Sequence, residues 1–276
     1  MESSDLEPVT PVQPMAAWIG GKRLLAPLIS ERLSAIPHRC YAEPFVGMGG
    51  LFFRRPWRSH AEVINDINRD LVTLFRVLQR HHVEFFQMIR WRLASRADFE
   101  RLKATDPETL TDLERAARFL YLQRLAFAGK VSGQSFGVSP QESSSFDVTR
   151  LEPMLADLHD RLASVTIENL PYADFISRYD REETLFYLDP PYFGSEGDYG
   201  ANVFGRSDFR KLAELLGEIK GRFVLSINDV PEMRQAFAAF HIEEVETKYA
   251  IGNADRAEPV RELLISNVEM AAGSLL

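Results

Sequence analysis

Asp189-Pro190-Pro191-Tyr192 is the segment of this 276-residue chain whose residue types are best suited to chemistry. It follows the apolar run 184–188, which is typical of a buried strand. Each proline fixes its own φ at about −65° and removes a backbone donor. The turn therefore offers a carboxylate, two carbonyl groups and an aromatic ring, with few donors to compete for them. Such a set suits an exocyclic amine on a planar base, although Asp-Pro also occurs in simple strand-ending turns.

A glycine-rich segment, Glu43 to Gly50, follows a short predicted strand and is expected to open a helix. Its glycines let the backbone turn tightly and approach a ligand closely. The spacing is G-x-G-G and lacks the third glycine of the dinucleotide fingerprint G-x-G-x-x-G, which disfavours a nicotinamide dehydrogenase. Asp66 lies 19 residues after Gly47, at the end of another predicted strand. A carboxylate there accepts ribose hydroxyls, unless Asp66 or Asn65 only caps the next helix.

A third element, Trp18-Ile19-Gly20-Gly21-Lys22, precedes the first strand of this pattern. Two glycines expose backbone amides and Lys22 adds a cation, so this segment could bind the carboxylate of an amino-acid moiety. Together the three elements describe an adenosine-like cofactor with an amino-acid end. Ligands in open α/β sheets bind beyond the carboxyl ends of the strands, so the cofactor and the amine-binding turn are predicted to share one crevice.

Composition excludes several classes of protein and of site. Hydrophobic residues make up 45% of the chain, which is enough for a sizeable core. The single cysteine, Cys40, rules out a disulfide framework and a cysteine-based zinc site, and it favours a reducing, cytoplasmic location. No apolar run reaches the roughly 18 residues that span a bilayer. The six histidines lack the spacing of metal ligands, so we expect neither a membrane nor a metal partner.

Charge is unevenly distributed along the chain. The net charge is −8, and residues 151–276 account for most of it with 12 basic and 23 acidic side chains. Residues 76–124 instead contain nine arginines. Such arginines usually form a solvated helix face, but a local positive potential also suits nucleic acid. DNA binding therefore stays open despite the acidic total.

The predicted elements divide the chain into an α/β body and a helical insert. Strand and helix patterns alternate at 15–75 and 161–276, which predicts a doubly wound, mostly parallel sheet. Residues 76–160 have helical apolar spacing and a loop rich in Gly, Ser and Gln. The acidic, proline-rich residues 1–14 are expected to be a disordered lead-in. The predicted strands are 40–43, 61–65, 165–168, 184–188, 222–227, 241–249 and 260–266.

The order of these motifs resembles the Dam-type DNA adenine methyltransferases of the D12 class, α group. Agreement extends to Phe119–Arg124, Leu225–Asp229 and Arg261–Leu264, and covers roughly residues 16–267. The resemblance implies S-adenosyl-L-methionine as methyl donor and the N6 amine of a flipped-out adenine in double-stranded DNA as acceptor. It also implies a Rossmann-like methyltransferase sheet with an antiparallel strand late in the chain, and an insert that recognises the target.

The resemblance carries roles to particular positions. The implied catalytic set is Asp189, Pro190, Pro191 and Tyr192. The implied cofactor contacts are Trp18, Gly21, Lys22, Glu43, Phe45, Gly47, Gly49, Asp66 and Asp189. The implied DNA contacts are Arg124, Phe127, Lys130 and Gln134, in a monomer or weak dimer.

The insert departs from the family at one place. Members that read GATC carry Asn-Arg-Tyr-Gly-Tyr-Asn-Gly-Leu where this chain has 123–130, with Phe127 in place of a tyrosine that wedges into the base stack. GATC specificity is therefore in doubt, and the loop 129–137 looks more like prophage-encoded members. Two alternatives stay open: the same chemistry on cytosine N4, RNA adenine or a glutamine amide, and a catalytically silent DNA-binding module.

Overall fold

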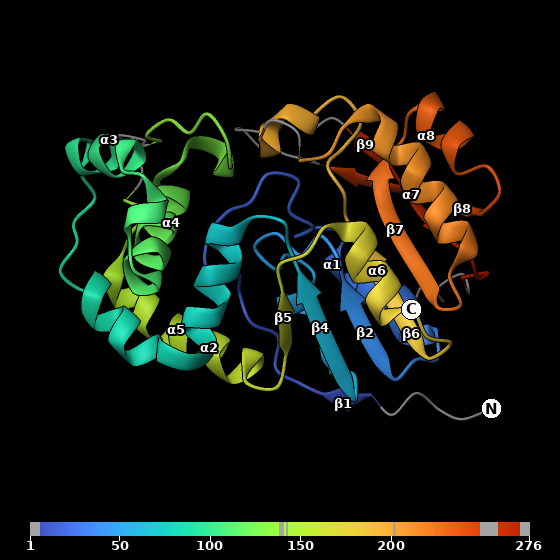
Figure 1. Ribbon diagram of the computed structural model, residues 1–276, viewed down its shortest axis with the longest axis horizontal. Coiled ribbons are helices and arrows are strands. Elements are labelled where there is room, and N and C mark those ends of the chain that lie inside the picture. The colour runs from blue at the N-terminus through green and yellow to red at the C-terminus, as the bar shows by residue number, and fades with distance from the viewer. Residues whose placement is uncertain (1–5, 138–140, 142, 201–202, 249–258, 271–276) are drawn as a thin grey trace.

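The computed structural model describes residues 6–137, 141, 143–200, 203–248 and 259–270. A seven-stranded sheet forms the body, in the order β5-β4-β2-β6-β7-β9-β8 (Figure 1). The first five strands in this order run parallel, and β9 is antiparallel to both of its neighbours. This confirms the predicted mostly parallel sheet with a late antiparallel strand. The strands are β2 (Cys40–Glu43), β4 (Ala61–Asn65), β5 (Thr166–Glu168), β6 (Thr184–Leu188), β7 (Arg222–Asn228), β8 (His241–Lys248) and β9 (Pro259–Ser266).

Side chains along the central strand alternate between two hydrophobic cores. In β6, Leu185 and Tyr187 belong to one core, and Phe186 and Leu188 belong to the other. Successive side chains of a strand point to opposite faces of a sheet. A central parallel strand is buried on both faces, which explains why its sequence is continuously apolar.

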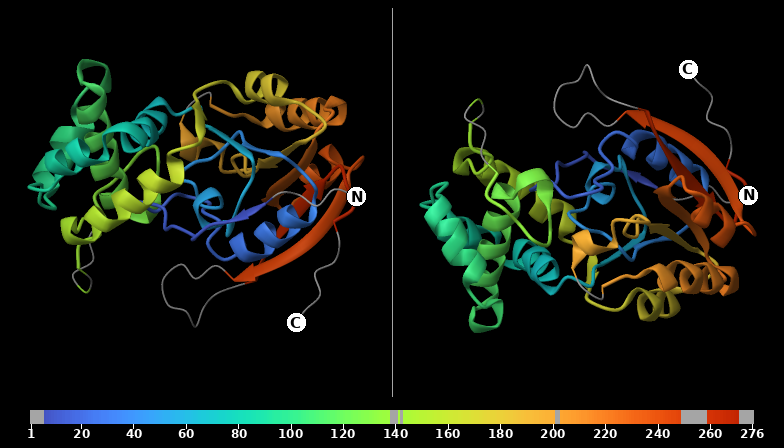
Figure 2. Two further views of the ribbon diagram at one scale, coloured as in Figure 1. Left: turned by 90° about the horizontal axis from the view of Figure 1, so that it is seen from below. Right: turned by 90° about the horizontal axis from the view of Figure 1, so that it is seen from above.

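Helices cover both faces of the sheet. The helix α1 (Ala26–Ala35) packs in the core that contains Leu185. The opposite core is covered by α6 (Tyr172–Tyr179), α7 (Arg206–Glu218) and α8 (Pro231–Ala236). Figure 2 shows α1 on one side of the sheet and the pair α6 and α7 on the other.

The chain order reverses between β2 and β6. From β2 the chain proceeds outward through β4 to β5, and then returns to β6 on the other side of β2 and continues to β7. Ligands of doubly wound sheets bind at such a reversal, beyond the carboxyl ends of the strands. The glycine-rich segment after β2 and the Asp189 turn after β6 therefore lie at the same edge.

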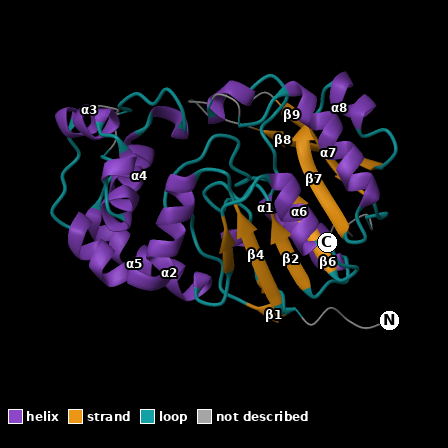
Figure 3. Ribbon diagram, viewed as in Figure 1, coloured by secondary structure: helices purple, strands orange, loops and turns teal. Residues whose placement is uncertain are grey.

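The helices of the insert lie beside the sheet (Figures 1 and 3). They are α2 (Arg69–Ile89), α3 (Arg96–Ala104), α4 (Asp112–Leu125) and α5 (Val148–Leu162). The helix α2 leaves the sheet and has a kink at His81, where φ is −138° and ψ is 32°. Buried residues of α2, α4 and α5 form one continuous core with those of the sheet. Insert and body therefore pack as one unit, and a domain boundary at 76 and 160 stays a prediction.

Two expectations about local structure are wrong. Residues 6–14, expected to be disordered, contain β1 (Glu7–Pro8), which pairs with β3 (Trp57–Arg58). An ion pair of 2.6 Å between Glu7 and Arg58 and further backbone hydrogen bonds hold this segment in place. The glycine-rich segment opens no α-helix, because only a 3₁₀ turn, η1 (Phe52–Arg54), follows before Pro56.

The outer end of the sheet agrees with the prediction as far as it is described. The strand β8 ends at Lys248, and Tyr249, expected to be part of it, lies outside the described residues. None of the helices in the described ranges is both long and apolar enough to cross a membrane.

Candidate active site

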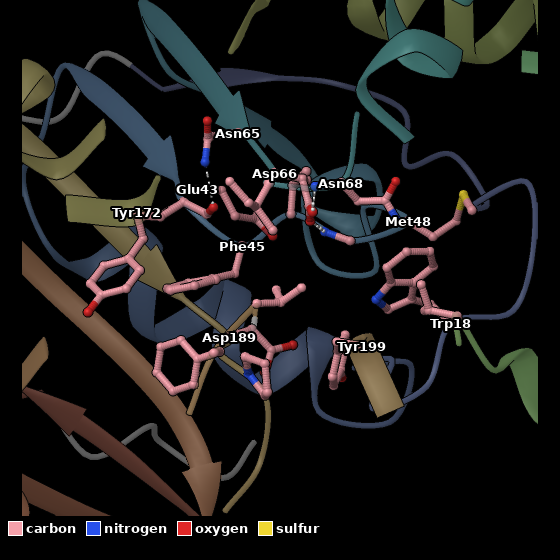
Figure 4. Close-up of a pocket in the computed structure, with 18 of the residues that line it drawn as sticks. Trp18, Glu43, Phe45, Met48, Asn65, Asp66, Asn68, Tyr172, Asp189 and Tyr199 are labelled. Atoms are coloured by element: carbon pink, nitrogen blue, oxygen red, sulfur yellow. Dashed lines mark hydrogen bonds between the residues drawn. The ribbon is translucent and has the colours of Figure 1, made fainter. Parts of the chain in front are cut away.

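A cavity of about 550 Å³ lies at the reversal of the sheet. Its walls come from the segment 18–22, the glycine-rich segment, the end of β4 and the Asp189 turn. Figure 4 shows Asp66 and Asp189 on opposite walls, with Trp18 toward one end and Tyr172 toward the other. The predicted cofactor elements and the predicted catalytic aspartate therefore share one crevice. The volume lies within the range of about 300–1,000 Å³ that is usual for small-molecule sites.

Asp66 connects the end of β4 to the glycine-rich segment. Its Oδ2 accepts a hydrogen bond of 3.0 Å from Gly47 N, and its Oδ1 accepts one of 2.8 Å from Asn68 N. The cap of α2 is Asn68, whose side chain accepts from two backbone amides of the first turn. Asp66 is thus free of the capping role, and burial raises its pKa to about 6. A carboxylate offers about four acceptor sites, so these two hydrogen bonds leave capacity for a ligand.

Gly47 can be no larger than glycine. Its φ is +49°, and a Cβ there would lie 2.6 Å from Trp18 Nε1. The left-handed region is costly for other residues, and the contact brings the edge of the indole against the backbone. Gly49 repeats the pattern, with a φ of +74° and a Cβ position 2.3 Å from Phe53. Gly47 therefore lines the cavity and allows Trp18 to form one end of it, whereas Gly49, predicted to contact the cofactor, packs on Phe53 and is not among the lining residues.

Asp189 stands at the end of β6 with 21% of its side chain exposed. Its Oδ1 lies 2.7 Å from Lys22 Nζ and accepts a hydrogen bond of 3.2 Å from Ser226 Oγ. Burial raises the pKa of Asp189 to about 6, and the neighbouring Lys22 opposes that rise. Pro190 and Pro191 are buried behind it, and Pro191 lines the cavity.

Lys22 lies in surroundings that differ from the prediction. A cation was expected to be available to the cofactor, but the side chain is 1% exposed and its ammonium contacts Asp189. The ammonium also donates to the Tyr192 hydroxyl at 2.6 Å and lies 4.4 Å from the centre of that ring. These contacts join the carboxylate and the aromatic ring of the Asp-Pro-Pro-Tyr motif. They therefore favour a role of Lys22 in that motif over a role in cofactor binding.

Glu43 ends β2 beneath the cavity and is 2% exposed. Its Oε2 accepts a hydrogen bond of 2.8 Å from the buried Tyr41 hydroxyl. Burial raises the pKa of Glu43 to about 8, so near neutral pH the protonated form predominates. Glu43 therefore lines the cavity mainly as an uncharged group.

Three aromatic side chains of the cavity escape the sequence reasoning. Tyr172 and Phe204 lie 5.5 and 5.8 Å from Phe45 between ring centres. Tyr199 donates a hydrogen bond of 3.1 Å from its hydroxyl to the carbonyl of Ile19. Tyr172 comes from the start of α6, and Tyr199 and Phe204 come from the segment after the Asp189 turn. In the sequence, these residues are distinguished by their aromatic type alone.

The four predicted DNA contacts of the insert fall into two groups. Arg124 donates to the carbonyls of Met15 and Ser145, and burial lowers its pKa. The Gln134 amide donates to the Gln123 side chain and the Lys130 carbonyl. Phe127, in contrast, is 64% exposed, and Lys130 is exposed as well. Arg124 thus joins the insert to the segment at Met15 and Gln134 holds its own loop together, while Phe127 and Lys130 face solvent.

Within the described ranges, no group of three or more His, Cys, Asp or Glu side chains is arranged to hold a metal ion. Residues 18–251 match the family described as D12 class N6 adenine-specific DNA methyltransferase. The chain belongs to this family. The enzyme class expected from the sequence is thereby confirmed, and the family implies S-adenosyl-L-methionine as methyl donor.

Relatives of this D12-class methyltransferase come from viruses and bacteria. Type II methyltransferase M.CviBI of Paramecium bursaria Chlorella virus NC1A is 23% identical over 242 residues, covering 86% of this chain and 91% of the relative. DNA adenine methylase of Escherichia coli K12 is 24% identical over 267 residues, covering 90% and 92%. DNA N-6-adenine-methyltransferase of Escherichia phage P1 is 27% identical over 254 residues, covering 82% of this chain and 31% of that protein. Among solved structures, the ribosomal protein L11 methylase of Lactobacillus delbrueckii subsp. bulgaricus aligns with a TM-score of 0.39 at 13% identity, covering 95% of this chain and 89% of that one.

Proposed function

We propose that this methyltransferase transfers a methyl group from S-adenosyl-L-methionine to the N6 amine of an adenine that has been flipped out of duplex DNA. The observation that carries the proposal is the shared cavity. One wall presents Asp66 and the glycine-rich segment, and the opposite wall presents Asp189 at the end of a buried strand. Donor and acceptor sites of a direct transfer must be neighbours, and two walls of one cavity would meet this requirement.

The residues present fit the methyl donor. Asp66 would accept the ribose hydroxyls with the acceptor capacity that Gly47 and Asn68 leave. Phe45 and Tyr172 offer aromatic surface for the adenine end, and Trp18 closes the opposite end of the cavity. When bound, the cofactor supplies an electrophilic methyl group on a positively charged sulfur.

Asp189 and the Pro190 carbonyl would accept the two N–H groups of the target amine. The amine nitrogen is a poor nucleophile while its lone pair is delocalised into the ring. Hydrogen bonds from both N–H groups to Asp189 and the Pro190 carbonyl would let the nitrogen pyramidalise and would free its lone pair for methyl transfer. Orientation of this kind contributes about 7–11 kcal/mol in well-aligned reactions. Asp189, whose pKa burial raises to about 6, then stands ready to take the proton that the methylated amine loses.

The target base must leave the helix to reach this cavity. Tyr192 would stack on it, a contact worth about 1–3 kcal/mol per base. Phe127 is the candidate to fill the space in the duplex, because it is 64% exposed and its backbone is fixed by a hydrogen bond of 2.9 Å to Ser135 O. Lys130 nearby would contact phosphate.

The test is transfer of tritium from labelled cofactor to DNA, followed by nucleoside analysis of the digest. Label on N6-methyladenine supports the proposal. Label on cytosine N4, or label only with RNA, would assign the same chemistry to another amine. If the protein bound both cofactor and DNA but transferred no label to any nucleic acid, it would be a catalytically silent DNA-binding module.

A further inference from the structure

We propose that Lys22 and Glu262 form a buried positioning pair that fixes Asp189 and Tyr192 for methyl transfer. The inference rests on the proposed function and deepens it. It gives Lys22 a role different from the cofactor contact that its motif predicts. Glu262 lies on β9, in register with Asn228 of β7, far from the catalytic motif in sequence.

The contacts of Lys22 account for all three hydrogens of its ammonium. It donates to the Gly20 carbonyl at 3.2 Å and to the Tyr192 hydroxyl at 2.6 Å, and it lies 2.7 Å from Asp189 Oδ1. With 1% of the side chain exposed, water cannot replace these partners. Lys22 therefore ties the first residue of the Asp-Pro-Pro-Tyr turn to the last.

The two oxygens of Asp189 are used differently. Lys22 and the Ser226 hydroxyl both contact Oδ1. Ser226 gives its one hydrogen to Asp189, so the Tyr187 hydroxyl at 2.8 Å must donate to Ser226. Among the described residues, the hydrogen bonds to this carboxylate thus anchor Oδ1. Since Asp189 lines the cavity, Oδ2 is left to accept a hydrogen bond from the target amine.

Glu262 supplies the counter-charge that holds Lys22 in the protein interior. Its side chain is 0% exposed, and its Oε2 lies 3.7 Å from Lys22 Nζ. One ammonium is thus shared between two carboxylates, Asp189 and Glu262. A buried charge without a partner is costly, so Glu262 keeps Lys22 buried while leaving Asp189 incompletely neutralised and able to accept further hydrogen bonds.

The charges around Asp189 set the direction of each test. Lys22 favours its ionised form, and Glu262 disfavours it. Glu43 on β2 also acts on Asp189 through its charge, but its own raised pKa makes it mostly neutral near pH 7. Among the described residues, further titratable neighbours are the hydroxyls of Tyr187, Tyr192 and Tyr199.

The experiment uses Lys22→Met and Glu262→Gln in the full chain, with Glu243→Gln as the matched control. Glu243 on β8 forms an ion pair of 2.8 Å with Arg32 on α1. Neither residue lines the cavity. Carbon-13 NMR of labelled aspartate, with the signal of Asp189 assigned from Asp189→Asn, gives its pKa in the free protein. We expect Lys22→Met to raise that pKa, Glu262→Gln to lower it, and Glu243→Gln to leave it unchanged. Opposite shifts from two buried neighbours are not produced by a general loss of packing.

Turnover and cofactor affinity are measured on the same variants. Both cavity variants should lower kcat roughly 10–100-fold, since small misplacements at a reacting centre have effects of this size. Cofactor Kd by calorimetry should change by less than about threefold. A loss of cofactor affinity equal to the loss of turnover in Lys22→Met would overturn the proposal and make Lys22 a cofactor contact. An unmoved Asp189 pKa in that variant would overturn it as well.

Two further results keep the test decisive. Thermal melting is recorded for each variant, and Lys22→Gln replaces Lys22→Met if the latter unfolds. The titration needs neither DNA nor methyl transfer. Opposite pKa shifts in a protein that methylates nothing would therefore defeat the proposed function while leaving the positioning pair intact.

Discussion

Ionisable side chains around the cavity and those of the helical insert differ in what they contact. In the cavity, Lys22 and Glu43 are almost fully buried, and Asp189 exposes only 21% of its side chain. Each is bonded to another functional group within 3 Å. In the loop 127–137 of the insert, Lys130 is exposed, and among the described residues no ion pair holds its ammonium. A cavity residue therefore acts through its neighbours, and an exposed residue of this loop acts on its own.

Most arginines of the insert also have partners within the protein. Arg115 contacts Asp70 and Glu108, and Arg118 contacts Asp70 and the Leu102 carbonyl. Arg124 is bonded to backbone carbonyls. The arginine content of 76–124 thus overstates the charge available to DNA, because several guanidinium groups stabilise the insert. The comparison predicts large, coupled effects from cavity variants and small, separate effects from variants of the exposed loop residues.

The largest effect is expected from Asp189→Asn. The amide keeps the size of the side chain but loses the charge that Lys22 contacts and can turn a donor toward the target amine. We expect kcat to fall by about 10²–10⁴-fold, the usual contribution of a positioned acid–base group, with DNA affinity unchanged. Single-turnover assays and DNA titrations measure both. Exposed Asp174 on α6 provides the control, as Asp174→Asn. Near-normal turnover of Asp189→Asn would show that the carboxylate does not bind the amine.

The cavity wall is the part of the molecule that sequence predicts well. Parallel strands end at one edge, so residues directly after β2, β4 and β6 must be neighbours once the strand order is known. Glu43, Asp66 and Asp189 each follow or end an apolar strand that is evident in the sequence. Their spacing along the chain therefore determines their position in space.

The roles of Lys22 and Arg124 could not be predicted in the same way. Lys22 stands in a loop and Arg124 in the last turn of α4, and what a long side chain contacts at such positions depends on packing between distant segments. Glu262 is 240 residues from Lys22 in the chain, and Met15 is 109 residues from Arg124. A motif indicates that a cation is present, but its partner is decided by tertiary structure.

A second effect on the cavity is expected from Asp66→Ala. This carboxylate holds Gly47 and Asn68 and is proposed to accept the ribose. Cofactor binding should weaken by about 1–3 kcal/mol, the range for a lost buried hydrogen-bonding group. Calorimetry measures the change, and Asn68→Ala, which removes the cap of α2 without touching the proposed ribose acceptor, is the comparison. Unchanged cofactor affinity in Asp66→Ala would remove Asp66 from the site.

Glu43→Gln tests how the protonation of the buried Glu43 carboxyl group affects the pH dependence of stability. The pKa of Glu43 rises to about 8 in the folded protein from an ordinary 4.5. Between these values the folded protein binds more protons than the unfolded chain, so the free energy of unfolding falls as pH rises through this window. Glu43→Gln should lessen that fall and be more stable at pH 8 by about 1–3 kcal/mol.

Urea unfolding at pH 5 and pH 8 measures this difference for Glu43→Gln. Exposed Glu152 on α5 supplies the control, as Glu152→Gln. Asp66 and Asp189, whose pKa values burial raises to about 6, act in the same direction, so both proteins should still lose stability between pH 5 and about 6, and the difference between them should grow above that pH. A slope equal to that of the unmodified protein would mean that Glu43 is ionised at no cost.

Alanine substitutions at two glycines with left-handed backbone conformations distinguish the effect of backbone strain from the effect of contact with Trp18. Gly47 has a φ of +49° and a Cβ position 2.6 Å from the Trp18 ring, whereas Gly133 has a φ of +61° and no heavy atom within 4 Å. Gly133→Ala should lower the free energy of unfolding by about 1 kcal/mol from strain alone. Gly47→Ala should lower it further and weaken cofactor binding, as urea unfolding and calorimetry would show. Equal effects of the two substitutions would mean that Trp18 moves freely.

The smallest effects, and the sharpest contrast, are expected from Lys130→Gln and Arg124→Gln. Exposed Lys130 is proposed to neutralise one phosphate, so its loss should reduce the slope of log affinity against log salt by about 0.9. Stability should then stay within about 0.5 kcal/mol, as for most surface changes. Arg124→Gln should leave the salt slope unchanged, because its guanidinium serves the Met15 and Ser145 carbonyls. Unfolding should instead become easier by about 1–3 kcal/mol, since buried acceptors lose their donor. If the two variants exchanged these outcomes, Arg124 would be the DNA contact that its motif suggests and Lys130 a structural residue.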